Sequence, residues 1–166
     1  IAQAALAQCE SMGFKVSASV VDRGGLTIVM LRGDGAGLHT PEGAERKAYT
    51  ARTFSQPSAD FVKRLSDRPD TAGSRQYTRV LALGGGLPIK AGNEVVGAVG
   101  VSGSPGKDDV CSQAGIDKVA DQLGSANGAR DAEAEKLSDQ LSRTQELRDR
   151  VSRLQRSMEE LKGAQG

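Results

Sequence analysis

Hydrophobic residues in the first three quarters of the chain recur with the periods of both helices and strands. Helical spacing is found in four segments, which are residues 1–12, 40–54, 58–66 and 107–123. Strand-like runs occupy residues 14–21, 26–31, 80–90 with a break at three glycines, and 94–102. The hairpin connections are too short for the crossovers that parallel strands need. The pattern predicts an α+β domain, in which helices pack on an antiparallel sheet.

Cap and turn residues refine these elements. Thr40 followed by Pro41 predicts an N-cap and a first helical residue. Residues 68–76 are expected to form a loop. Glycine or alanine alternates with valine in residues 94–102. This alternation is typical of a central strand that a helix approaches closely.

A different pattern begins after residue 128 and predicts one long amphipathic helix. Five apolar residues are spaced by 4, 3, 4 and 3 positions, as in a heptad repeat: Leu147, Val151, Leu154, Met158 and Leu161. Self-association as a coiled coil and docking on the chain's own body or on a partner protein both remain open. We expect a domain over residues 1–123, a linker over 124–128 and this helix over 129–166.

Composition separates the same regions and excludes some functions. The chain has 166 residues, 21 of them glycine, no tryptophan and a formal net charge of +1. Such balanced charge argues against nucleic-acid binding, which requires a strong basic excess. No apolar run approaches the roughly 18 residues of a membrane span. The tail holds only two of the glycines, Gly163 and Gly166.

Short motifs in the body resemble those of a known family. They stand in family order: Val20–Gly25, Arg32–Ala36, Lys47–Ala51, Gly84–Ile89 and Gly97–Gly103. Over residues 1–123 the chain is similar to the GlcG/HbpS-like family of heme-binding or heme-degrading proteins, whereas the C-terminal helix lies outside the family pattern. The resemblance implies an α/β sandwich with an antiparallel sheet, assembly into oligomers, and heme as a cofactor.

Four polar residues are candidates for binding a ligand on the body. Arg32 and Asp34 follow a strand and are expected to line a cleft, although Asp34 also suits a turn or a pair with Arg32. Lys47 lies on a helix with an alanine face, where it would meet a heme propionate or form a salt bridge with Asp34. Thr50, one helical turn later, would face the same cleft.

Ser102 and Gly103 form a weaker candidate site. The amides of residues 102–106 open a helix, and a helix N-terminus attracts carboxylate or phosphate. The alternative is that these glycines serve tight turns and close packing. Their GxxGxxG spacing is not that of a dinucleotide-binding fold.

Iron ligands are scarce in this sequence. His39 is the only histidine, and histidine is a common iron ligand of heme. Tyr49 or Tyr77 offers a phenolate and Met30 a thioether, although Met30 suits the core. Few aromatic residues are available to enclose heme, so a heme site would lie at a subunit interface. No metal-ligand cluster or Ser-His-Asp arrangement is indicated, which favours binding over catalysis.

Cys9 and Cys111 lie on the first and last helices of the body. If their Cα atoms fall within about 7 Å, a disulfide is possible. It would indicate a periplasmic or otherwise exported protein, whereas two free thiols would fit the cytoplasm. The chain starts inside a helix, which is compatible with a removed signal peptide.

These patterns together favour a small oligomeric protein that binds heme or a related anionic ligand, for storage, sensing or degradation. The main alternative is a non-catalytic accessory subunit of a larger complex, docked through residues 129–166. A third hypothesis is that the protein is a weak enzyme, which degrades heme or acts on a small carboxylic acid.

Overall fold

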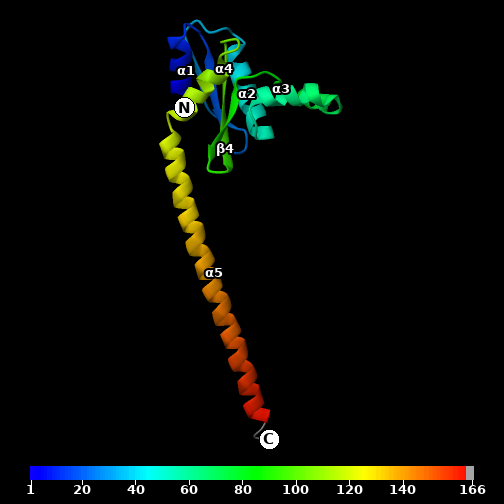
Figure 1. Cartoon of the computed structure of the whole chain (residues 1–166), viewed down its shortest axis with the longest axis vertical. Coiled ribbons are helices and arrows are strands. Elements are labelled where there is room, and N and C mark those ends of the chain that lie inside the picture. The colour runs from blue at the N-terminus through cyan, green and yellow to red at the C-terminus, as the bar shows by residue number, and fades with distance from the viewer. Residues whose placement is uncertain (164–166) are drawn as a thin grey trace. The chain divides into compact units, whose positions relative to one another are not determined.

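The computed structural model describes residues 1–163, so the last three residues of the expected tail lie outside the described part. The chain divides into two compact units, with the boundary between Gly124 and Ser125. The first unit holds a sheet and its helices, and the second is helical (Figure 1). Among the described residues, none of the helices is long and apolar enough to span a membrane.

The first unit is an α+β domain, as the sequence predicts. Its elements, in chain order, are α1 (Ala2–Ser11), β1 (Ser17–Val21), β2 (Thr27–Arg32), α2 (Thr40–Phe54), α3 (Ser58–Asp67), the 3₁₀ helix η1 (Pro69–Gln76), β3 (Gly86–Ala91), β4 (Glu94–Ser102) and α4 (Asp108–Asp117). α5 (Ala120–Gly163) starts at the end of this unit and continues through the second.

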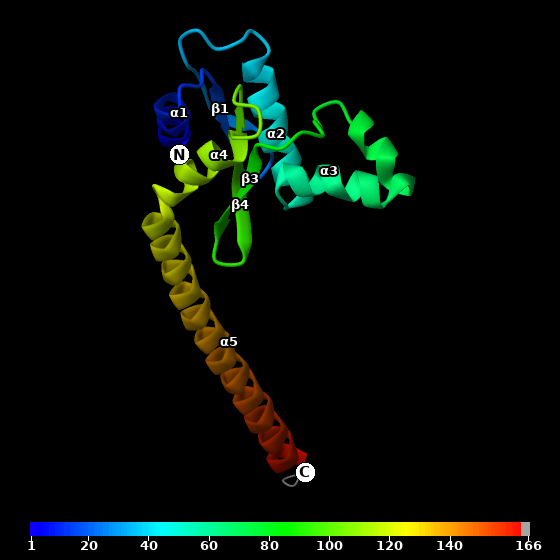
Figure 2. The same ribbon diagram turned by 45° about the horizontal axis from the view of Figure 1, so that its top comes forward.

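The four strands form one antiparallel sheet in the order β2-β1-β4-β3. Side chains of a strand alternate between the two faces of its sheet. Val99 and Val101 therefore join the core beneath α1 and α4, whereas Ala98 packs with Ala48 and Ala51 of α2. The sheet lies between α2 on one face and α1 with α4 on the other (Figure 2).

Backbone contact between α2 and the central strand β4 fixes the position of α2. A Cβ atom at Gly100 would collide with the carbonyl oxygen of Ala44 and lie 2.6 Å from the amide of Ala48. Only glycine allows this approach. The expectation of a central strand closely approached by a helix is confirmed.

Several element boundaries differ from the sequence prediction. Residues 80–83 are not a strand, because β3 begins only at Gly86. Val80 instead fills a small core with Phe61 and Leu65 of α3. Residues 69–76 are a 3₁₀ helix rather than a loop. The expected helix over 107–123 is interrupted, since α4 ends at Asp117 and α5 begins at Ala120.

The predicted N-cap is also displaced by one residue. His39 occupies the N-cap position of α2, and Thr40 is already helical. The Thr40 hydroxyl donates to the carbonyl of Gly37 at 2.8 Å and lies 2.8 Å from the hydroxyl of Ser17. Because the hydroxyl is used in these contacts, it does not cap the helix.

α5 runs through residues 124–128 without a break, so these residues are helical and do not form the expected loop. An isolated glycine costs a helix only about 1 kcal/mol relative to alanine, and Gly124 and Gly128 are not enough to end it. The helix carries exposed apolar side chains at Leu137, Leu141, Leu147, Val151, Leu154 and Met158. The side chain of Leu161, the fifth residue of the predicted heptad pattern, lies outside the described part.

A disulfide joins α1 to α4. It links Cys9 and Cys111, whose Cα atoms are 5.5 Å apart and whose positions differ by 102 residues. Both residues are fully buried. The bond closes a covalent loop that contains the whole sheet together with α2 and α3.

Candidate functional site

A cavity of about 610 Å³ lies where β4 ends and where α2 and α4 begin. Its walls combine glycines, charged residues and a few apolar side chains. The lining residues are Lys15, Gly37, His39, Thr40, Lys47, Leu83, Gly84, Ser102, Gly103, Pro105, Gly106, Asp108 and Asp109. Four of the residues predicted from the sequence are among them: His39, Lys47, Ser102 and Gly103.

A buried ion pair forms one wall of the cavity. The Lys47 ammonium donates to Asp108 Oδ2 at 2.7 Å and to the carbonyl of Val101 at 3.1 Å. The two charged side chains are only 5% and 11% exposed. The salt bridge from Lys47 to Asp34 that the sequence suggested is therefore wrong, because the Lys47 ammonium binds Asp108 at the start of α4.

The second oxygen of Asp108 binds the loop before α4. Asp108 Oδ1 accepts the Ser104 amide at 2.9 Å and the Ser104 hydroxyl at 2.7 Å. The next residue, Asp109, accepts the amide of Gly85 at 2.7 Å. The N-terminal end of α4 thus already carries two carboxylates of its own, as the helix dipole favours. This arrangement disfavours the predicted binding of an external anion by the amides of residues 102–106.

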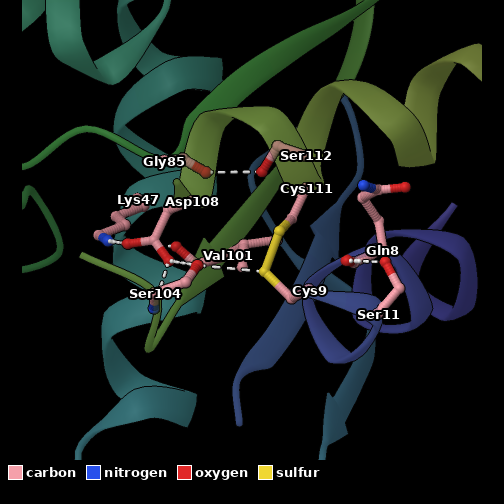
Figure 3. Close-up of a disulfide and its surroundings, with 10 residues drawn as sticks. All are labelled: Gln8, Cys9, Ser11, Lys47, Gly85, Val101, Ser104, Asp108, Cys111 and Ser112. Carbon is pink, nitrogen blue, oxygen red and sulfur yellow. Dashed lines mark hydrogen bonds and ion pairs between the residues drawn. A yellow bond between two sulfur atoms is a disulfide. The ribbon is translucent and has the colours of Figure 1, made fainter. Parts of the chain in front are cut away.

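The ion pair and the disulfide are connected through Ser104. Its hydroxyl oxygen lies 3.1 Å from Cys9 Sγ and donates to Asp108, so contacts run from Lys47 to the disulfide (Figure 3). One turn along α4, the Ser112 hydroxyl donates to the carbonyl of Gly85 at 2.8 Å. These buried bonds hold α4 in place against the rest of the wall.

His39 stands at the exposed side of the cavity, and Gly37 makes room for its ring. A Cβ atom at Gly37 would lie 2.9 Å from His39 Cε1 and 3.2 Å from Nδ1. Within the described part of the chain, the imidazole nitrogens form no hydrogen bond or ion pair. Lys15 is a second exposed group on the lining. These two side chains are free to meet a ligand.

Two other predicted residues lie outside the cavity. Arg32 donates to the carbonyl of Ala36 through Nε at 3.2 Å and Nη2 at 2.6 Å. Its guanidinium therefore closes the turn that follows β2. Asp34 is exposed within this turn. The turn interpretation of Asp34 agrees with this placement. Neither Arg32 nor Asp34 lines the cavity, although the sequence suggested that both would line a cleft.

Thr50 and Tyr49 contact the segment between η1 and β3. The Thr50 hydroxyl donates to the Arg46 carbonyl at 2.8 Å and accepts the Leu81 amide at 2.9 Å. The Tyr49 ring carries the Arg79 guanidinium 4.1 Å from its centroid. Neither residue lines the cavity, so Tyr49 is not placed to ligate iron there.

Sequence reasoning missed Asp108, Asp109 and Lys15. Two acidic residues in the first turn of a helix are an ordinary N-terminal signal, and they gave no sign of the buried pair with Lys47. The formal charges of Lys15 and Lys47 cancel those of the two aspartates. No group of three or more histidine, cysteine, aspartate or glutamate side chains suited to a metal ion occurs among residues 1–163.

Comparisons with known proteins agree with this fold. A crystal structure of a Streptomyces reticuli HbpS double mutant is 38% identical, with a TM-score of 0.67 over 71% of this chain and 80% of that one. The crystal structure of a PduOC–heme complex is 26% identical, with a TM-score of 0.62 over 69% of this chain and 85% of that one.

The sequence of the first unit is also similar to those of known proteins. An uncharacterised 15.0 kDa protein from the dhaT-dhaS intergenic region of Citrobacter freundii is 34% identical over 111 residues, which is 66% of this chain and 78% of that protein. Residues 1–117 match the family described as haem degrading protein HbpS-like. The chain therefore belongs to the HbpS-like family.

Proposed function

We propose that this protein binds heme, or a closely related anionic tetrapyrrole, in the cavity at the start of α2 and α4. The single observation that carries the proposal is the exposed His39 imidazole on the lining of that cavity. Membership of the HbpS-like family and the likeness to a protein crystallised with heme support the choice of ligand.

The residues present fit such a ligand. A volume of about 610 Å³ falls within the roughly 300–1,000 Å³ of small-molecule sites. Gly37 leaves space for the His39 ring, and a neutral imidazole nitrogen is a common axial ligand of heme iron. A bound heme would supply a redox-active iron. His39 would hold that iron, and the glycines around the lining would admit a flat ring.

The two lysines of the cavity have different roles. Lys47 is committed to Asp108 and is almost fully buried, so it stabilises the wall. Lys15 is exposed and is the cation available to a propionate. The ligand-binding role that the sequence assigned to Lys47 passes in this proposal to Lys15.

A second copy of the chain would complete the apolar enclosure. Leu83 and Pro105 are the larger apolar groups on the lining. Leu38, next to His39, is 87% exposed, and Leu83 is 54% exposed. In this proposal a second copy covers these two exposed leucines. We therefore place the heme site at a subunit interface, which retains the prediction of a homo-oligomer.

Hemin titration of the intact protein tests this function. We expect a Soret band at micromolar hemin, and His39→Ala should shift the band and weaken binding by at least about tenfold, since an iron–ligand bond is lost. Lys15→Ala should weaken binding less and leave the band position unchanged. Tyr49→Phe is the matched control and should behave as the wild type.

Two results would overturn the proposal. One is the absence of any spectral change at micromolar hemin. The other is an unchanged band in His39→Ala together with a shifted band in Tyr49→Phe, which would move the ligand to the tyrosine outside the cavity.

The buried disulfide supports an exported protein. Disulfides persist in oxidising compartments and are rare in the cytoplasm. Mass measurement of protein isolated without reductant should show the loss of two hydrogens that the Cys9–Cys111 bond requires. Two alkylatable thiols in the native protein would favour the cytoplasmic alternative.

A further inference from the structure

One side of α5 carries an unpartnered apolar seam, which we define as Leu147, Val151, Leu154 and Met158. These four side chains are 62%, 52%, 57% and 57% exposed. Their spacing of 4, 3 and 4 residues places leucine at the d positions of a heptad, and valine and methionine at the a positions. Leucine at d with a β-branched residue at a suits a two-stranded coiled coil.

The charges beside the seam have one sign. In this register the flanking e and g positions hold four basic residues and two neutral ones: Arg143, Arg148, Arg150, Gln155, Ser157 and Lys162. The acidic residues of the same stretch occupy the b, c and f positions, away from the seam: Glu146, Asp149, Glu159 and Glu160. The seam is therefore bordered by positive charge alone.

Pairing of two copies would place basic residues opposite basic or neutral ones, with no acidic residue to pair with them. In a parallel pair, the g position of one helix faces the e position of the next heptad in the other, so Arg143 would meet Arg148 of the second copy. In an antiparallel pair, g faces g and e faces e, so basic residues again face basic or neutral residues and never an acidic one. Like charges at these positions destabilise a coiled coil. About two heptads of apolar contact offer little to offset this repulsion.

We propose that the seam of α5 binds a helix of a different protein, with apolar a and d positions and glutamate or aspartate at the flanking e and g positions. Such a helix buries the four apolar side chains and pairs with Arg143, Arg148 and Arg150. This surface lies in the second unit and is independent of heme binding.

A protein helix fits this seam better than a lipid surface does. Helices that lie in a membrane interface carry a broad apolar face with tryptophan or phenylalanine. Here the apolar residues fill only two of every seven positions, and residues 125–163 contain no aromatic residue. A narrow stripe of this kind is the seam of a coiled coil.

Peptide binding to the full chain tests the proposal. Two synthetic helices of about four heptads, with identical valine and leucine seams, would carry either glutamate or lysine at all e and g positions. We expect the acidic peptide to bind and the basic peptide to bind at least roughly tenfold more weakly, because each charge pair along the border is attractive with the first peptide and repulsive with the second. Leu154→Asp should abolish binding without affecting the first unit.

Charge-matched variants separate specific pairing from general attraction. Arg148→Glu with Arg150→Glu leaves two basic and two acidic residues on the border of the seam and should remove the preference between the two peptides. Arg153→Glu with Arg156→Glu changes the net charge equally on the far face and should bind as the wild type. Equal loss in both double variants would overturn the proposal.

Three further outcomes would also overturn it. The first is equal binding of both peptides. The second is binding of neither peptide together with a fall in oligomer mass in Leu154→Asp, which would assign the seam to a second copy. The third is binding of neither peptide together with Leu154-dependent binding to phosphatidylserine vesicles, which would assign it to a membrane.

Discussion

Replacement of Lys47 by methionine is the sharpest test of how the cavity wall is stabilised. Methionine keeps an unbranched apolar stem in a similar volume, so the change removes mainly the ammonium. Asp108 Oδ2 then loses a donor at 2.7 Å, and the Val101 carbonyl loses one at 3.1 Å. The carboxylate is left with its Ser104 bonds and no opposite charge.

The expected cost follows from burial. Removing one partner of a buried pair costs about 3–5 kcal/mol, because the remaining charge is uncompensated. The side chains are 5% and 11% exposed, so solvent screens the loss poorly. For a domain of roughly this size, such a loss lowers the melting temperature by about 10–20 °C.

The assay must follow the first unit and not the long helix. Tyr49 and Tyr77 both lie in the first unit, and the chain has no tryptophan. Tyrosine fluorescence in a urea titration therefore reports on unfolding of the sheet domain, whereas far-ultraviolet circular dichroism would also report on α5. The disulfide should be kept intact in all variants.

Two further variants test whether the loss of stability comes from the uncompensated Asp108 charge. Lys15→Met removes an exposed cation of the same cavity and should change the free energy of unfolding by less than about 0.5 kcal/mol. Lys47→Met combined with Asp108→Asn removes both charges and should restore about 2 kcal/mol of the single loss. A Lys47→Met variant within 1 kcal/mol of the wild type would refute the reasoning, as would a double variant less stable than the single one.

The remaining predictions concern the disulfide and the contact between α2 and β4. Replacing both Cys9 and Cys111 by alanine opens a loop of 102 residues. Loop-closure entropy predicts that this lowers the free energy of unfolding by about 4–5 kcal/mol, measured by urea titration against the oxidised wild type. A decrease below about 1 kcal/mol would contradict this prediction. Gly100→Ala should prevent folding or lower stability by several kcal/mol, because its Cβ would overlap the Ala44 carbonyl, whereas Gly73→Ala, with open space around it, should behave as the wild type. Soluble, equally stable Gly100→Ala protein would show that α2 can shift away from the sheet.

The fold was predictable wherever a local pattern determines the element. The alternation of small residues with valine identified β4 with its observed bounds, because a central strand beneath a helix needs that alternation. Residues 80–83 show the limit of such reasoning. Their apolar run suits a strand, but Val80 is drawn into the core of α3, where it packs on Phe61 and Leu65.

The candidate site was predictable only in part, because its contacts are distant in sequence. The sequence places Lys47 on a helix with an alanine face, yet its partner Asp108 is 61 positions away. The short-range signals around Arg32 and Asp34 belong to a turn, and the turn leaves both residues outside the cavity. His39 lines the cavity because it is the N-cap residue of α2. The sequence pattern predicted the N-cap one residue later, at Thr40.

The disulfide has a mechanical consequence if α5 is held by a partner helix, as proposed above. Force applied between Ile1 and the end of α5 passes from α1 to α4 through the Cys9–Cys111 bond, and bypasses the 102-residue loop between them. Roughly 350 Å of extensible chain is thereby kept out of the force path. Tension transmitted along α5 can stretch or unwind that helix, while the sheet and the cavity remain mechanically shielded until the bond is reduced.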